Sequence, residues 1–195
     1  MPSSLPLRSI AAALALAGAC GAAAATAPQA AAASALPPTP VGTPHDFDFE
    51  HGRWRTTLRR LQHPLSGSQA WSDYAGTTLV SPIWGGRANL VELDVAGPAG
   101  RLQGLSLRLF DPERQRWTLN FANAAGGGLA TPMSGGFAGG RHGVFYSDET
   151  FGGRRVLVRF VIDATAADRC RFEQAFSPDG GATWEVNWIA EDTRL

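Results

Sequence analysis

The chain has 195 residues, enough for one ordinary domain, and its 17 basic and 17 acidic side chains give a formal net charge of zero. All the basic residues are Arg, so chemistry that depends on a Lys Schiff base is excluded. The Arg residues alternate with acids along the chain, which argues against the basic stripe that nucleic-acid binding requires.

Residues 1–27 have the order of a secretory signal. Arg8 supplies a cation, residues 10–19 form an apolar run, and small residues follow. The run is shorter than the about 20 residues that a membrane-spanning helix needs. We therefore expect a cleaved leader and a protein that works in the periplasm or outside the cell.

Two processing routes are open for this leader. The residues LAGAC, which end at Cys20, resemble a bacterial lipobox, in which the Cys is acylated and the protein becomes a membrane-anchored lipoprotein. The preferred aliphatic residue lies one place early, at Leu16. The rival route is ordinary cleavage among the Ala-rich residues 22–35. Cys170 is the other thiol of the chain, and we expect it to be a small buried hydrophobic side chain.

Residues 28–44 are dominated by Ala, Pro, Ser and Thr and carry no charge, which is typical of an extended tether. The domain is therefore predicted to span residues 45–195. Short β-rich runs recur in it, separated by Gly, Pro, Asn and Asp. The predicted strands are 53–61, 70–80, 87–95, 103–110, 115–122, 134–139, 142–148, 154–163, 170–177 and 183–194.

Several of these strands alternate between apolar and polar residues, which predicts a sheet with one buried face. The expected inward sets are Leu105, Leu107 and Leu109; Trp117, Leu119 and Phe121; and Val156, Val158, Phe160 and Ile162, with Arg108 on the opposite face. Short turns favour antiparallel neighbours in chain order. Nine or ten such strands close most easily into an up-and-down antiparallel β-barrel, an all-β fold.

The two ends of the domain carry a paired signal. The first strand opens with the G-x-W of Gly52 and Trp54, and the last strand ends with Arg194. This pair resembles the signature of calycins, the lipocalins and their relatives, in which an Arg from the last strand covers the Trp at the barrel base. The resemblance implies that Trp54 and Arg194 are in contact, with a cation–π attraction of about 0.5–2 kcal/mol.

Three longer segments extend the resemblance. HDFDFEHGRW, GLSLRLFDPERQRW and FEQAFSPDGGATWEVNWIAEDTR together resemble a widespread bacterial family of unknown function whose members are thought to be calycin-like. The resemblance implies a lipocalin-like barrel and supplies no catalytic residue.

SPDGGATW, residues 177–184, also matches the Asp-box of sialidases, which in those enzymes is a hairpin turn away from the active centre. We interpret it as a turn in which Ser177 and Asp179 bond to the loop backbone and the glycines take positive φ. A turn centred on Gly180 would pair Phe172 with Trp188 across the last two strands.

The sequence predicts neither a metal site nor a cofactor. Its four His residues share no metal-ligand spacing. The acidic pairs Asp148-Glu149 and Glu191-Asp192 are adjacent on strands, so their side chains point to opposite faces and cannot act together as acid and base. We therefore assign no catalytic residue.

The leading functional hypothesis is a barrel lumen that binds an apolar or amphipathic small molecule. The expected ligand-binding residues, taken from the inward parity of their strands, are Trp117, Phe121, Tyr146, Phe160, Gln174 and Trp188. Residues 122–136 are either a lid over the mouth or a mobile connection. One alternative is a structural or protein-interaction domain of the cell envelope with a filled barrel, and another is an enzyme acting on a hydrophobic substrate. The sequence leaves the oligomeric state open.

Overall fold

The structure is a computed structural model and describes residues 36–195. The predicted leader, the candidate lipidation residue Cys20 and the first part of the predicted tether lie outside the described residues. The strands are β1 (Gly52–Leu61), β2 (Trp71–Ile83), β3 (Ala88–Gly97), β4 (Gly100–Asp111), β5 (Arg116–Asn123), β6 (Met133–Ala138), β7 (His142–Phe151), β8 (Arg154–Ala166), β9 (Arg169–Ser177) and β10 (Glu185–Arg194). Two short 3-10 helices accompany them, η1 (Asp48–Glu50) and η2 (Trp84–Gly86).

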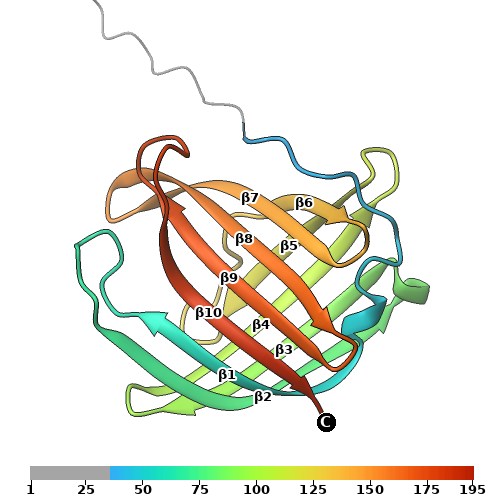
Figure 1. The fold of residues 1–195 in the computed structure, drawn as a ribbon, viewed down its shortest axis with the longest axis horizontal. Coiled ribbons are helices and arrows are strands. Elements are labelled where there is room, and N and C mark those ends of the chain that lie inside the picture. The colour runs from blue at the N-terminus through green and yellow to red at the C-terminus, as the bar shows by residue number, and fades with distance from the viewer. Residues whose placement is uncertain (1–35) are drawn as a thin grey trace, which may run out of the picture. The chain divides into compact units, whose positions relative to one another are not determined.

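Each strand pairs antiparallel with its neighbours in the chain, and β1 also pairs with β10, so the sheet closes on itself. In Figure 1, β8, β9, β10 and β1 form one wall and cross in front of β3, β4 and β5, as expected for tilted barrel strands. The predicted all-β, up-and-down barrel is confirmed.

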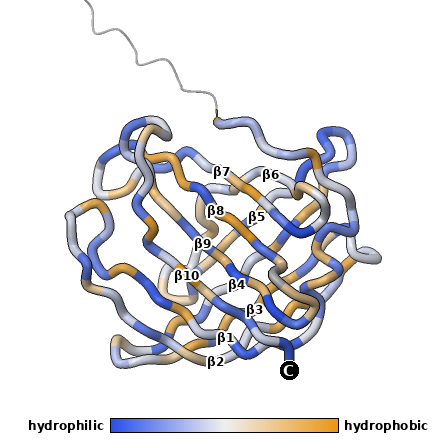
Figure 2. The backbone as a smooth tube through the Cα atoms, viewed as in Figure 1, coloured by the Kyte–Doolittle hydropathy of each residue, from blue (hydrophilic) through white to orange (hydrophobic). Residues whose placement is uncertain are grey.

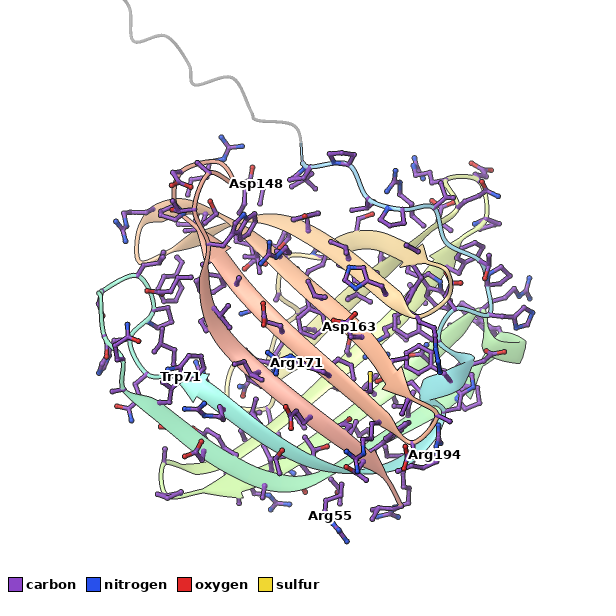
Figure 3. All side chains as sticks on the ribbon, in the orientation of Figure 1. Arg55, Trp71, Asp148, Asp163, Arg171 and Arg194 are labelled. Atoms are coloured by element: carbon purple, nitrogen blue, oxygen red, sulfur yellow. The ribbon has the colours of Figure 1, made fainter. Side chains whose placement is uncertain are left out.

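Side chains alternate between the lumen and the outer surface along the strands, so hydrophobic and hydrophilic residues interchange along the chain in Figure 2. The lumen-facing core includes Leu58, Val95, Leu119, Phe145, Ile162 and Phe172. On the outer face Asp163 of β8 lies opposite Arg171 of β9, and Arg55 points away from the barrel (Figure 3). Val156, Val158, Phe160 and Ile162 share the inward face, as their alternation predicted.

The segment that precedes β1 closes one end of the barrel. The ring of Phe47 is fully buried and packs edge-on against Trp117 and Phe137, with centroids 4.8 and 4.9 Å away. Just before it, the backbone N–H of Gly42 donates to the carbonyl of Gln115 at 2.7 Å, and the carbonyl of Thr43 accepts from the Trp117 indole at 2.9 Å. The last residues of the segment assigned to a tether are therefore in contact with the barrel.

Trp54 and Arg194 meet at this closed end. The guanidinium carbon of Arg194 lies 4.1 Å from the centroid of the Trp54 ring, which is 1% exposed. The guanidinium also donates to the carbonyls of Phe49 and His51. Gly52 has a φ of 120°, and an added Cβ would lie 3.2 Å from a guanidinium nitrogen of Arg194, so both backbone and space favour glycine in the G-x-W.

The predicted orientation of β4 was wrong. Pairing with β3 and β5 turns Leu102, Gly104, Ser106 and Arg108 into the lumen, so Leu105, Leu107 and Leu109 face outward. The physical reason is that the neighbouring strands decide the face: Arg108 pairs with Leu119, whose strand turns Trp117 and Phe121 inward as well.

The turn predicted at residues 177–184 is present. Ser177 Oγ and Asp179 Oδ1 are 2.7 Å apart, Asp179 accepts from the backbone N–H of Thr183 at 2.9 Å, and Gly180 and Gly181 have φ of 73° and 99°. The hydrogen bonds from Thr183, with the Ser177 hydroxyl adding to them, lower the pKa of Asp179 to about 2.

The strand register beyond the turn differs from the predicted one. A β-bulge between Val186 and Trp188 places Trp188 opposite Gln174, whereas Phe172 pairs with Ala190. The register is already one residue off before the bulge, because Phe176 pairs with Glu185, and the extra residue Asn187 adds a second residue of shift.

Candidate functional site

A cavity of about 330 Å³ lies inside the barrel. Its walls are largely apolar and come from most of the strands; Val91, Leu93, Leu102, Leu119, Phe172 and Ala190 are among the lining residues. This volume lies at the lower end of the about 300–1,000 Å³ that is usual for small-molecule sites.

The cavity opens at the end of the barrel opposite the Phe47 segment. Arg60 near the end of β1, Ala130 and Thr131 line it and are exposed. Glu149 of β7 also lines the cavity on this side, and the Ser147 hydroxyl donates to its carboxylate at 2.6 Å. The rim therefore carries groups of both charges around an apolar opening.

The segment between β5 and β6 forms part of the cavity wall. After β5 it turns back along that strand. The backbone N–H of Ala130 donates to the carbonyl of Phe121 at 2.8 Å, and Leu129 forms an isolated antiparallel β-bridge with Ala122. β5 and β6 pair directly only over residues 117–119 and 133–135, so this segment covers the side of the barrel where the pairing is short.

The structure brings four of the six expected ligand-binding residues together. Phe121, Phe160, Gln174 and Trp188 line the cavity. Trp117 does point inward, but it lies fully buried beneath Phe47 at the closed end.

Tyr146 is also absent from the cavity wall. Phe145 takes the inward position on β7, so Tyr146 points to the outer face, where its ring centroid lies 6.1 Å from that of Trp184. The two predictions failed for different reasons. Tyr146 lies on the outer face of its strand, whereas Trp117 lies on the inner face but too close to the closed end to reach the cavity.

Gln174 lines the cavity and is also held by a hydrogen bond within the protein. Its amide nitrogen donates to Oδ1 of Asn187, the bulge residue, at 2.9 Å, and its side chain also lies on the cavity wall. The amide is therefore oriented by a protein partner while it faces the lumen.

The deep end of the cavity is polar. We call Glu50, Thr56, Thr78, Arg108 and Asp192 the polar floor; all five line the cavity and are at most 5% exposed. Arg108 donates to both carboxylate oxygens of Glu50, at 2.5 and 3.2 Å, and its guanidinium carbon lies 4.3 Å from the centroid of the Phe47 ring. This buried bidentate pair neutralises two charges that would otherwise be costly to bury, although Nε of Arg108 has no hydrogen-bond partner among the described residues.

Asp192 is the remaining acid of the floor. It lies on β10 opposite Thr56 of β1, whose hydroxyl is 2.7 Å from that of Thr78. Burial, with the charge of Glu50 adding to it, raises the pKa of Asp192 to about 7, against the opposing effects of the Thr56 hydrogen bond and the Arg108 charge. Its Oδ1 has no hydrogen-bond partner among the described residues.

The polar floor is not among the site residues predicted from the sequence, although part of it was detectable. Asp192 continues the inward alternation of Trp188 and Ala190, so parity alone places it in the lumen. Glu50 and Arg108 gave no such signal, because Glu50 precedes the first strand and Arg108 lies among leucines.

Within residues 36–195, no three His, Cys, Asp or Glu side chains are grouped as a metal site would require, and no helix is long and apolar enough to cross a membrane. Cys170 is buried, and this burial is the main cause that raises the pKa of its thiol far above the ordinary value. A thiol held protonated in this way is a poor nucleophile.

No protein-family model matches the chain, and no curated protein matches it in sequence at a significant level. Among solved structures, the S-type phycobiliprotein lyase CPES from Guillardia theta is similar with a TM-score of 0.51 and 10% identity, over 76% of this chain and 90% of that one. A redesigned β-barrel, mFAP0, bound to DFHBI matches with a TM-score of 0.42 and 9% identity, over 75% and 99%. At these identities the lyase supports the barrel fold and nothing finer.

Proposed function

We propose that this protein binds an apolar or amphipathic small molecule in the lumen of its barrel. The observation that supports the proposal is the cavity itself: about 330 Å³, with aromatic and aliphatic walls, an exposed rim at one end and a polar floor at the other. Burial of apolar ligand surface would supply most of the affinity, and the few polar groups would orient the ligand.

The alternative of a structural domain with a filled barrel has less support. Phe121, Phe160 and Trp188 contribute their rings to the wall and leave the centre of the lumen open. A barrel that served only as a rigid scaffold would gain packing contacts by filling this space with side chains.

The test is a pair of matched substitutions. Ala190 lines the cavity, so Ala190→Phe would fill it, whereas Ala96 lies exposed on the outer face of β3, so Ala96→Phe would leave it unchanged. Titration with apolar fluorophores and fatty alcohols, followed by tryptophan fluorescence, should show binding to wild type and Ala96→Phe and at least tenfold weaker binding to Ala190→Phe.

Native mass spectrometry of the protein purified from its own cells complements this titration, since a retained ligand would appear as a discrete added mass. Equal affinity in all three forms would overturn the proposal, as would the absence of any binding in both experiments.

We further propose that the protein is exported and acts in the periplasm or outside the cell. The basis is the order of charge, apolar run and small residues in positions 1–27. If Cys20 is acylated, Cys20→Ser should move the protein from the membrane fraction to the soluble periplasmic fraction. Recovery of the protein in the cytosol with the leader intact would contradict export.

A further inference from the structure

The polar floor contains a hydrogen-bond acceptor that the protein does not use. Asp192 is 3% exposed, lines the cavity, and its Oδ1 has no hydrogen-bond partner among the described residues. A buried carboxylate oxygen without a partner costs free energy comparable to a lost hydrogen bond, so such an atom is uncommon in a purely structural position.

The elements packed around Asp192 bring several titratable or charged groups toward it. Glu50 comes from η1, Arg108 from β4, and Cys170 lies opposite Asp192 on β9. Arg194, two residues further along β10, is engaged by Trp54 and two backbone carbonyls. Glu50 and Arg108 neutralise each other, with Nε of Arg108 left as an unpartnered donor, and the Cys170 thiol is held protonated, so Asp192 is the acid of the floor that has no cationic partner within residues 36–195.

Two threonine hydroxyls, those of Thr56 and Thr78, lie next to the Asp192 carboxyl. Thr56 is hydrogen-bonded to the Asp192 carboxyl, and its hydroxyl is 2.7 Å from that of Thr78. If Thr56 donates its proton to the carboxylate, the Thr78 hydroxyl donates to Thr56, and both donors are used within the protein. The floor then offers an incoming ligand an acceptor at Asp192.

We propose that the ligand enters with its polar head toward the floor and that this head is a hydrogen-bond donor, a hydroxyl or an amine, bound by Asp192. This inference rests on the proposed binding function and names the class of ligand. A carboxylate head, the common head group of amphipathic lipids, is disfavoured because it would place a second anion against Asp192 in a buried cavity.

The preference should depend on pH. Below about pH 7 the Asp192 carboxyl is increasingly protonated, because burial raises its pKa to about 7. An amine head therefore loses its charge-assisted partner as the pH falls, whereas the repulsion of a carboxylate head is relieved. The two head groups are expected to respond to pH in opposite directions.

The test uses three probes with the same apolar body: 1-naphthalenemethanol, 1-naphthylmethylamine and 1-naphthoate. Isothermal titration calorimetry at about pH 8.5 should give affinities about tenfold or more higher for the alcohol and the amine than for the naphthoate. At about pH 5.5 the amine should bind more weakly and the naphthoate more tightly than at the higher pH.

Asp192→Asn should abolish the pH dependence of amine binding, and Asp192→Leu should remove the preference for donor heads altogether. The control is Glu191→Gln, the neighbouring residue on β10, which points to the outer face and should behave as wild type. Circular dichroism of each variant establishes that it is folded before its affinities are compared.

The outcomes separate this inference from the proposed function. If the three probes bind with equal affinity, or if the preference survives in both Asp192 variants, the assignment of Asp192 is wrong while the binding function stands. If none of the probes binds to the wild-type protein at either pH, the result counts against the proposed function as well.

Discussion

Substitution of Asp192 by Asn should change how the stability of the protein depends on pH. In the folded protein burial raises the pKa of Asp192 to about 7, against an ordinary value of 3.8 in the unfolded chain. The folded state therefore holds a proton more tightly than the unfolded state between about pH 4 and pH 7. The stability associated with this group is fully present below about pH 4 and is lost as the pH rises through about 7.

The magnitude follows from the size of this difference. Each tenfold change in a protonation equilibrium corresponds to about 1.4 kcal/mol, so ionisation of Asp192 costs the folded state up to about 4 kcal/mol at pH 8. Asn cannot ionise, so Asp192→Asn removes this cost. Relative to wild type, the variant should gain as much as about 4 kcal/mol of unfolding free energy between about pH 4 and pH 8.

The assay is urea unfolding followed by tryptophan fluorescence at about pH 4.5, 6 and 8. The decisive quantity is how the difference in unfolding free energy between Asp192→Asn and wild type changes with pH. Any cost of the Asn amide that does not depend on pH cancels from this change. Glu191→Gln, on the exposed face of the same strand, should show a difference that is nearly independent of pH. A pH profile of Asp192→Asn parallel to that of wild type would show that burial does not raise the pKa of Asp192 in this way.

Three further substitutions test the closed end and the sheet, each by urea unfolding at neutral pH. Arg194→Ala should uncover the indole of Trp54 and cost about 1–3 kcal/mol; an unchanged midpoint would contradict their contact. Glu50→Ala should cost about 3–5 kcal/mol because it leaves Arg108 buried and unpaired, and a double variant with Leu at 50 and Met at 108 should recover most of the loss. Gly135→Ala should cost about 1–3 kcal/mol, because the added Cβ would lie 2.0 Å from a backbone oxygen of the next strand; wild-type stability would show that β6 can shift.

The strands and their order along the sheet follow from local patterns in the sequence. The alternation of Val156, Val158, Phe160 and Ile162 specifies an extended strand with one buried face, and the Gly-rich turns specify which strands are neighbours. These are local properties of adjacent residues, so no distant contact is needed to predict them. The same reasoning placed Phe121, Phe160, Gln174 and Trp188 on the cavity wall.

Which face of an ambiguous strand points into the lumen, and how deep each side chain lies, depends on long-range contacts in the folded barrel. On β4 both faces are partly apolar, and the lumen takes Arg108 because Glu50, 58 residues earlier in the chain, reaches it from η1 and neutralises it. The bulge at Asn187 likewise depends on the fit of β10 against β9. Local periodicity defines two faces of a strand, whereas the free energy of burying each face depends on partners that only the closed barrel brings together.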